Sequence, residues 1–364
     1  MRSGKAWVWL VGLALTSGLL SVPAATAAPG VAGRAIVRTE QLASRSPCAD
    51  PAKTRMSYGW PMKPFNVQHP LRGNFGDPRT LTPEDFGETG EGVPGDFSFH
   101  NGIDIAAPIG TPVYPVVSGV VRVVSPDELV VVTDDGRTFQ YWHLAATVVT
   151  GLSVVADRTI LGRIRAPADH VHLAEVDGFK AHNPLDPGHL EPYQDHTAPR
   201  VVRLGFRGIR DGIVSPNHVT GTVHIVASAR DMPPLPVSGA WFGFPLTPVL
   251  VAWRMTTASG VRVVPETIVV DTRRTEPLDR NFWRIYAPGT YQNFPVFANH
   301  YYFRRPGRYL YKLTPQPIDT LSLPNGRYTI TVNVADVCNN RGSLSEQVLI
   351  ANPRLARYPP HTPL

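Results

Sequence analysis

The sequence predicts an all-β protein with two domains, in which an antiparallel sheet is followed by a β-sandwich. The chain has 37 prolines and 31 glycines in 364 residues, and only 18% of its residues are charged. This composition is typical of turn-rich β domains rather than of disordered chains. Short runs of alternating apolar and polar residues recur between turn signals, as they do in β-strands. No amphipathic pattern predicts a helix of more than three turns.

The N-terminus has the form of a secretory signal peptide over residues 1–27. Arg2 and Lys5 precede an apolar run over 6–20, and Ala25-Thr26-Ala27 is a small-x-small cleavage site. The run is short for a membrane span of about 20 residues, which disfavours the alternative of an uncleaved anchor. We therefore expect an exported protein, in the cell wall or periplasm, with no stable membrane insertion after cleavage. Residues 28–55 are expected to form a linker.

The first folded domain is predicted over residues 56–190. Its expected strands cover 104–108, 111–117, 119–124, 129–133, 137–143, 159–164 and 170–176. Asp134-Asp135-Gly136 is a hairpin turn signal between two of them. Residues 82–98, rich in acids and glycines, are expected to form a solvated surface loop, or alternatively a wall of a substrate groove.

Two short motifs in this domain carry residue types that bind a catalytic metal. The first runs from His100 to Asp104 as His-Asn-Gly-Ile-Asp, and the second is His170-Val171-His172. A catalytic zinc takes three protein ligands, often histidine and carboxylate, and keeps one open position for water. His100, Asp104 and one histidine of the pair supply such a set. Because residues i and i+2 of a strand face the same side, both histidines of the pair can point into one site.

Further motifs surround these residues in a fixed order. Gly73-Asn74-Phe75-Gly76 precedes His100, and the motifs Gly110-Thr111-Pro112-Val113, Gly119-Val120-Val121, Tyr141-x-His143-Leu144 and Gly162 follow Asp104. Each motif alone is common, but the ordered combination is specific. It resembles the M23 family of lysostaphin- and LytM-like zinc metallopeptidases, over about a third of the chain.

The resemblance implies a fold, a cofactor and a set of roles. The fold is the duplicated hybrid motif, an antiparallel sheet. The implied activity is that of a zinc-dependent endopeptidase that cuts peptide stems or cross-links of bacterial peptidoglycan. By position, His100, Asp104 and His172 match the family's Zn²⁺ ligands, and His143 and His170 match its two catalytic histidines.

The sequence also departs from the family pattern. Leu173 and Ala174 stand where the family has an aromatic residue and then an acid, and Glu175 comes one residue late. A shift of one residue places Glu175 on the opposite face of the strand. The glycine- and serine-rich loop before the histidine pair is shortened to 163–168. These departures bear on substrate choice. A second His-x-x-x-Asp pair, His182 and Asp186, lies in a turn-rich loop and is interpreted as a bystander.

The second domain is predicted over residues 200–352, with a tail over 353–364. Its expected strands cover 220–227, 249–255, 261–271, 308–313 and 327–334. The turn and strand over 323–332 resemble the final strands of bacterial immunoglobulin-like modules, which implies an immunoglobulin-like β-sandwich. Cys48 and Cys338 are the only cysteines. An even count in an exported protein predicts a disulfide between them, with two free thiols as the alternative.

These features favour a secreted zinc-dependent endopeptidase acting on peptidoglycan peptides. The alternatives are a non-catalytic cell-wall-binding or hydrolase-activating protein, and an adhesin built around the second domain. The formal net charge of +6 comes from scattered basic residues that are not interleaved with aromatic residues. This disfavours nucleic acid as a partner. The sequence indicates no oligomeric state.

Overall fold

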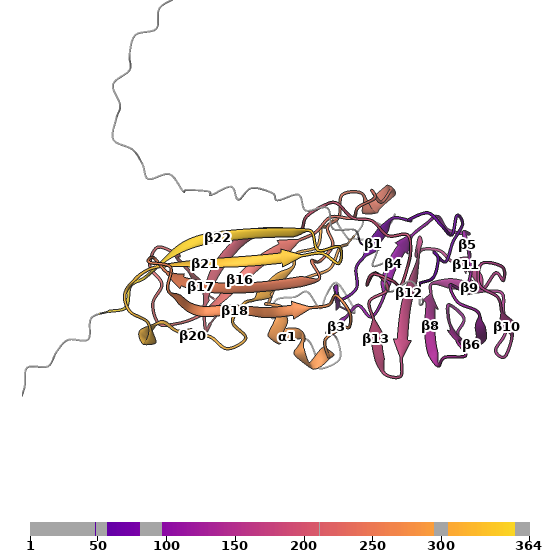
Figure 1. Ribbon diagram of the computed structural model, residues 1–364, viewed down its shortest axis with the longest axis horizontal. Helices are drawn as coiled ribbons and strands as arrows, with labels where there is room; N and C mark the ends of the chain where they lie inside the picture. Colours follow the sequence, from indigo (N-terminus) through magenta and orange to yellow (C-terminus); the bar gives the residue numbers. More distant parts are fainter. Residues whose placement is uncertain (1–47, 49–56, 81–96, 211, 295–304, 354–364) are drawn as a thin grey trace, which may run out of the picture. The chain divides into compact units, whose positions relative to one another are not determined.

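The computed structural model describes residues 48, 57–80, 97–210, 212–294 and 305–353. The all-β prediction is confirmed, because the regular structure of these residues is almost entirely β-strand, with one short α-helix, α1 (Phe282–Ile285) (Figure 1). The predicted signal peptide lies outside the described residues, as do the linker apart from Cys48, most of the loop 82–98 and the tail beyond residue 353. No helix in the described part of the chain is long and apolar enough to cross a membrane.

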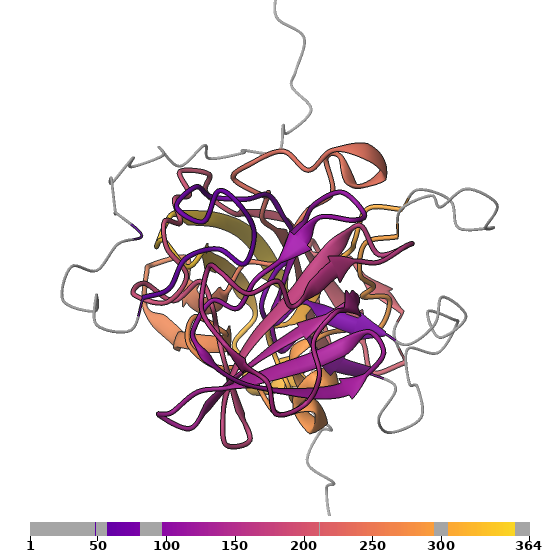
Figure 2. The same ribbon diagram turned by 90° about the vertical axis from the view of Figure 1, so that its right-hand side faces the viewer.

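An eight-stranded antiparallel sheet, here called the large sheet, holds most of the strands before residue 183. Its order is β1 (Leu71–Gly73), β4 (Ile103–Ala106), β12 (His170–Asp177), β8 (Arg137–Trp142), β7 (Glu128–Val132), β6 (Gly119–Ser125) and β10 (Ser153–Val154), with β13 (Lys180–His182) also paired to β12 (Figures 1 and 2). Two smaller sheets accompany it, namely β5 (Pro112–Val113) with β11 (Gly162–Ile164) and β9 (Leu144–Ala146), and β2 (Pro78–Thr80) with β3 (Phe97–Phe99).

Strand β12 lies in the interior of the large sheet, between β4 and β8. Six consecutive residues, from His170 to Glu175, are buried, as expected for a strand covered on both faces. One face of the sheet packs on an apolar core whose largest side chains include Trp60, Phe75, Ile103, Phe139, Tyr141 and Leu173. The other face of β12 carries His170 and His172.

The strands after residue 199 form two further antiparallel sheets. One has the order β15 (Ile213–Val214), β14 (Arg200–Gly208), β16 (Thr222–Arg230) and β19 (Leu310–Lys312), with β20 (Ile318–Asp319) also paired to β16. The other has the order β18 (Arg262–Asp271), β17 (Leu250–Thr257), β21 (Gly326–Ala335) and β22 (Arg341–Ile350). Phe206 and Ile225 of the first sheet share a core with Trp253, Ile330 and Val332 of the second. This is the predicted sandwich, whose immunoglobulin-like arrangement stays a prediction.

Two long strands of the sandwich, β14 and β22, are not predicted by the sequence pattern. In β14 a bulge between Val201 and Arg203 breaks the period of two, so alternation begins only at Leu204. β22 pairs with β21 alone and stands at the end of its sheet, and its outward residues are polar or small. Conversely, the strand predicted over 111–117 shortens to β5. Prolines 112 and 115 lack the N–H that a sheet ladder requires.

Aromatic side chains before His100 belong to the core of the sandwich. Phe97 and Phe99 of β3 pack against Phe282, with ring centroids 5.4 and 5.5 Å apart. Phe97 also contacts Trp283 edge-on, with centroids 4.8 Å apart. The segment that leads into the His100–Asp104 motif is therefore held in place by residues about 180 positions later in the sequence.

Candidate active site

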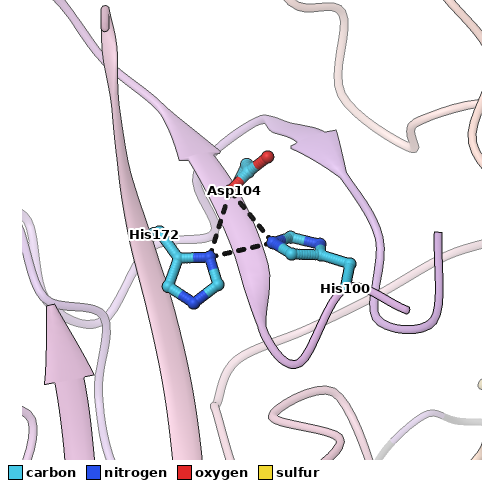
Figure 3. A group of neighbouring side chains, drawn as sticks. All are labelled: His100, Asp104 and His172. Carbon is cyan, nitrogen blue, oxygen red and sulfur yellow. Dashed lines mark hydrogen bonds and ion pairs between the residues drawn. The ribbon is translucent and has the colours of Figure 1, made fainter. Parts of the chain in front are cut away.

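His100, Asp104 and His172 converge beside the large sheet (Figure 3). Asp104 on β4 and His172 on β12 are direct partners in the antiparallel register, and His100 comes from the loop before β4. His100 Nε2 lies 2.8 Å from His172 Nδ1. Asp104 Oδ1 lies 3.2 Å from the first nitrogen and 3.4 Å from the second. All three side chains are buried.

Neighbouring residues permit this approach and orient the rings. A Cβ at Gly102 would overlap the backbone O of Leu173 and lie 2.8 Å from Cε1 of His172, so only glycine fits there. Trp142 is opposite His172 on β8, and their rings stack with centroids 4.3 Å apart and an interplanar angle of 20°. The imidazole of His172 is thus held between the indole of Trp142 and the loop at Gly102.

The hydrogen bonds of His100 define which nitrogen faces the cluster. The backbone O of Asn74 can only accept, so His100 Nδ1 donates to it at 2.7 Å and Nε2 is left as an acceptor. Burial lowers the pKa of His100 to about 3, which keeps the ring neutral at pH 7. Nε2 of His172 is buried and has no hydrogen-bond partner.

Asp104 is ionised. Burial by itself raises the pKa of Asp104, but the contacts with His100 and Arg79 outweigh burial and hold that pKa well below its usual value. Arg79 Nη2 donates to Asp104 Oδ2 at 2.7 Å. The other oxygen, Oδ1, faces the two imidazoles. His100 Nε2, Asp104 Oδ1 and His172 Nδ1 therefore face one another with at most one proton, on His172, among them.

These three atoms fit a zinc ion. On a tetrahedral zinc with bonds of about 2.1 Å, ligand atoms lie roughly 3.4 Å apart. The distances from Asp104 Oδ1 to the two imidazoles are 3.2 and 3.4 Å, and the two imidazole nitrogens, 2.8 Å apart, would separate by roughly 0.6 Å on binding the ion. Two histidines and one carboxylate are also a common donor set of catalytic zinc. Among the described residues, His182 and Asp186 join no group of potential metal ligands.

His143 and His170 lie next to this cluster. Their ring centroids are 4.3 Å apart, and His170 Nε2 lies 3.6 Å from Asp104 Oδ1. Burial lowers the pKa of His143 to about 4 and the pKa of His170 well below its usual value, so both rings are neutral at pH 7. His143 has a φ of 68°, which is uncommon for a residue other than glycine. Backbone strain of this kind clusters at functional sites.

The structure thus brings together all five site residues that the sequence predicts. Sequence reasoning did not identify Arg72, Arg79, Trp142 or Trp241 as their neighbours. The sequence contains a local indication that Trp142 lies near the site, because Trp142 precedes His143 on a predicted strand. It contains no such indication for Trp241, which lies far along the chain in the second predicted domain.

A second group of potential metal ligands was also missed. Asp195, Asp231 and Asp336 are buried, and one carboxylate oxygen of each lies within 4.8 Å of the others. Burial raises the pKa of Asp195 to about 6 and that of Asp336 to about 7. A group of three carboxylates drawn from three distant segments leaves no pattern in the sequence.

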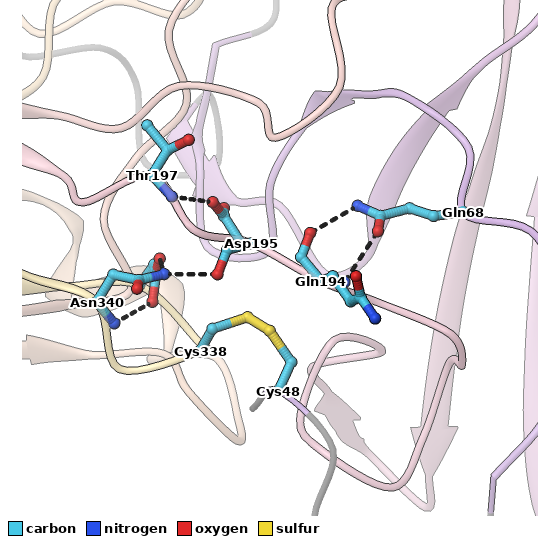
Figure 4. Close-up of a disulfide and its surroundings, with 8 residues drawn as sticks. Cys48, Gln68, Gln194, Asp195, Thr197, Cys338 and Asn340 are labelled. Atoms are coloured by element: carbon cyan, nitrogen blue, oxygen red, sulfur yellow. Dashed lines mark hydrogen bonds between the residues drawn. A yellow bond between two sulfur atoms is a disulfide. The ribbon is translucent and has the colours of Figure 1, made fainter. Parts of the chain in front are cut away.

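Cys48 and Cys338 form a disulfide, with their Cα atoms 4.5 Å apart (Figure 4). The bond connects a residue that precedes the large sheet to the turn between β21 and β22, across a sequence separation of 290. No free cysteine remains, since both cysteines of the chain are in this bond.

Comparison with known proteins adds a family. A model of peptidase family M23 matches residues 98–187, the segment that contains His100, Asp104, His143, His170 and His172. No curated protein matches the chain in sequence.

Solved structures resemble part of the chain. The catalytic domain of the antimicrobial peptidase lysostaphin from Staphylococcus simulans is 26% identical over 31% of this chain and 86% of that chain, with a TM-score of 0.24. A zinc-containing peptidase from Vibrio cholerae is 27% identical over 33% of this chain and 36% of that chain, with a TM-score of 0.25. The SpoIIQ–SpoIIIAH pore-forming complex is 21% identical over 36% and 89%, with a TM-score of 0.27.

At TM-scores this low, none of these likenesses assigns an activity or a substrate to this chain. The family model is the finding that identifies the segment. That model spans every site residue, so residues 98–187 are the part of the chain that resembles peptidase family M23.

Proposed function

We propose that the protein is a secreted zinc-dependent endopeptidase that hydrolyses peptide bonds in the stems or cross-links of bacterial peptidoglycan. One observation carries the proposal. His100 Nε2, Asp104 Oδ1 and His172 Nδ1 are buried and face one another, with at most one proton, on His172, among them. One proton cannot satisfy three such atoms, whereas a cation can be bound by all of them. The match to peptidase family M23 supports the reaction class, and the resemblance of the ordered motifs supports the substrate class.

The residues of the chain divide the chemistry between them. A zinc ion held by His100, Asp104 and His172 supplies a Lewis acid for a water molecule and for the scissile carbonyl. His170 donates through Nδ1 to the backbone O of Ala168, so its Nε2 is the acceptor that faces the cluster and takes the proton of the water. His143, neutral and adjacent, donates a hydrogen bond to the developing oxyanion.

Location outside the cytoplasm is part of the proposal. The predicted signal peptide at residues 1–27 supports it, and so does the disulfide between Cys48 and Cys338. Disulfides persist in oxidising compartments and are rare in reducing ones. Peptidoglycan is present in the same extracytoplasmic compartment, so the proposed enzyme meets its substrate there.

The test combines metal analysis with digestion of purified peptidoglycan of several chemotypes, followed by mass spectrometry of the released fragments. We expect about one zinc per chain, and fragments whose new amino and carboxyl ends lie within stems or cross-links. Removal of zinc with a chelator should stop the release, and added zinc should restore it. One zinc per chain with no fragment from any chemotype would support the non-catalytic wall-binding alternative. Protein purified from zinc-containing medium without zinc would contradict the metal centre.

A further inference from the structure

Arg72 on β1 is a largely buried arginine that contacts His170. Its Nη1 donates to Asp169 Oδ1 at 2.9 Å, and its Nη2 lies 3.1 Å from His170 Nε2. Only 10% of the Arg72 side chain is exposed. A guanidinium can only donate, so His170 Nε2 accepts from it, while His170 Nδ1 donates to Ala168 O. Both ring nitrogens are therefore engaged, and the contacts select the tautomer with the proton on Nδ1.

Trp241 covers the guanidinium of Arg72. The Cζ atom of Arg72 lies 3.8 Å from the centre of the Trp241 ring, a distance that gives a cation–π contact. Trp241 ends the 3-10 turn η2 (Gly239–Trp241), within a loop of the sandwich that runs from β16 to β17. Two backbone hydrogen bonds between Asp231 and Leu246, of 2.8 and 3.0 Å, close the base of this loop.

The loop is fixed at both of its sides. Val237, Trp241 and Phe244 form a small apolar cluster that packs on Ala106, the residue opposite His170 in the sheet register. The backbone O of Pro245 accepts from Asn293 Nδ2 at 2.7 Å and from Tyr309 OH at 3.1 Å.

These contacts connect the core of the sandwich to the candidate active site. Tyr309 belongs to the core of the sandwich, and Ala106 is two residues from Asp104 on β4. Trp241 is therefore held at a defined place beside Arg72, and Arg72 at a defined place beside His170.

We propose that Trp241 and Arg72 are positioning residues for His170, so that the sandwich contributes to the site through Trp241. Arg72 sets the tautomer and orientation of His170, and Trp241 holds Arg72. The inference rests on the proposed function in treating His170 as the proton acceptor. When a water molecule gives its proton to His170 Nε2, it displaces Nη2 of Arg72, while the pairing of Nη1 with Asp169 keeps the arginine in place.

The first test does not depend on activity. Nitrogen-15 NMR of histidine side chains in the zinc-loaded full chain reports which ring nitrogen carries the proton, and His170→Ala assigns the signal. In the wild type we expect a single His170 tautomer with the proton on Nδ1. In Arg72→Met and Trp241→Leu we expect a mixture of tautomers, and in Trp241→Phe, which keeps an aromatic face, a return toward the wild-type signal. Phe179→Leu is the matched control, since Phe179 is a fully exposed aromatic residue of the β12–β13 turn.

The second test is kinetic. Loss of a residue that orients a catalytic group typically costs on the order of 10- to 100-fold in activity. We expect Arg72→Met and Trp241→Leu each to lower kcat by about tenfold or more, with KM changed by less than about twofold, because the change affects the chemical step. If Trp241 acts through Arg72, the double variant should be no slower than Arg72→Met alone, because residues that act as a unit are not additive. Trp241→Phe should restore most of kcat.

Three results would overturn the inference. They are a single unchanged His170 tautomer in both Arg72→Met and Trp241→Leu, losses of kcat that multiply in the double variant, or a rise of kcat in Arg72→Met, which would make the contact inhibitory. If Trp241→Leu does not fold, Arg72→Met decides the tautomer, and Trp241→Phe should then match the wild type. Absence of peptidase activity in the wild type would contradict the proposed function instead, and the NMR result would then decide the positioning alone.

Discussion

Strand β12 carries a different buried polar cluster on each of its faces. On one face His172 joins His100 and Asp104, and the three facing atoms share at most one proton, on His172. On the other face Glu175 is bound by three donors. Tyr58 OH and His189 Nδ1 donate to Oε2 at 2.8 and 2.7 Å, and Arg137 Nη1 donates to Oε1 at 3.0 Å.

The difference lies in the balance of donors and acceptors rather than in burial, since His172 and Glu175 are both almost fully buried. Each oxygen of Glu175 has a donor from the protein itself, so this cluster is complete and stabilises the sheet. The His172 cluster has at most one proton, on His172, among its three facing atoms, and a cation would satisfy all three at once. The comparison also explains why Glu175, one residue late for the family pattern, has no part in the site.

Substituting one residue on each face of β12 tests this comparison, and this pair of variants has the largest expected effect. His172→Ala removes a metal ligand, so zinc per chain should fall from about one to near zero and activity should be lost. Glu175→Gln keeps the side-chain volume and changes only the other face, so zinc should stay near one. Metal analysis after dialysis, with peptidoglycan turnover alongside, measures both. Equal zinc loss in the two variants would show that the clusters are not independent.

His143 and His170 border the acceptor cluster without being needed to complete it. His143→Ala and His170→Ala should therefore keep zinc near one per chain and lose about 10²- to 10⁴-fold in kcat, the range typical of a positioned acid–base group. Near-normal turnover of His170→Ala would mean that His170 is only a packed strand residue. Zinc lost equally from His170→Ala and His172→Ala would mean that the two histidines do not divide the roles as proposed.

The Glu175 cluster, in which each carboxylate oxygen has a donor, should contribute to the free energy of unfolding. Removing one partner of a buried, hydrogen-bonded ion pair costs about 3–5 kcal/mol, because the remaining charge is left unpaired. Glu175→Ala leaves His189 without this partner, while Arg137 keeps its pair with Asp135, so we expect a loss at the lower end of this range, about 3 kcal/mol, in the free energy of unfolding. Tyr58→Phe removes only one of the two donors to Oε2 and should cost about 1.5 kcal/mol. Urea unfolding of zinc-loaded protein measures both. A change below 1 kcal/mol in Glu175→Ala would remove the structural role assigned to the cluster.

The sequence predicts the five site residues because each lies in a short motif whose spacing has a direct geometric meaning. His170 and His172 are two apart on a strand, and the strand is where the pattern predicts it. Contacts that cross between distant segments have no such signal. The stacking of Trp142 on His172 depends on the register of β8 and β12, and the contact of Trp241 with Arg72 depends on a loop of the sandwich. Neither register nor loop position is encoded in local spacing.

Asp195, Asp231 and Asp336 form a third buried polar cluster, which can be compared with the two on β12. Few hydrogen-bond donors contact its carboxylates, and the group contains no histidine. Asp195 accepts from Thr197 N (Figure 4). It also has a side-chain hydrogen bond with Tyr193, and Asp336 accepts twice from Asn340. Burial raises the pKa values of Asp195 and Asp336 to about 6 and about 7, and burial together with the other two carboxylates raises that of Asp231 well above its usual value. Protons, rather than a cation, are expected to complete this group.

The two carboxylate clusters should therefore respond to pH in opposite directions. Burial raises the pKa of Glu175, but its bonds to His189, Tyr58 and Arg137 prevail and lower it, so its stabilisation is present above about pH 4.5 and is lost as the pH falls below that value. The three aspartates have raised pKa values, so their stabilisation is full below about pH 4 and is lost as the pH rises through about 6 to 7. In that window the folded state binds more protons than the unfolded state, and the free energy of unfolding falls.

Asp336→Asn should flatten this fall, because the amide resembles the protonated carboxyl and no longer titrates. The slope is at most about 1.4 kcal/mol per pH unit for each extra proton bound, so we expect the variant to differ from the wild type by about 1 kcal/mol per unit between pH 4.5 and 7. Urea unfolding of the oxidised protein across this range measures it. Glu175→Gln is the control, since it should change the slope only below about pH 4.5. Identical slopes for Asp336→Asn and wild type would show that the carboxyl is ionised when folded, and a donor or a cation would then have to complete the group.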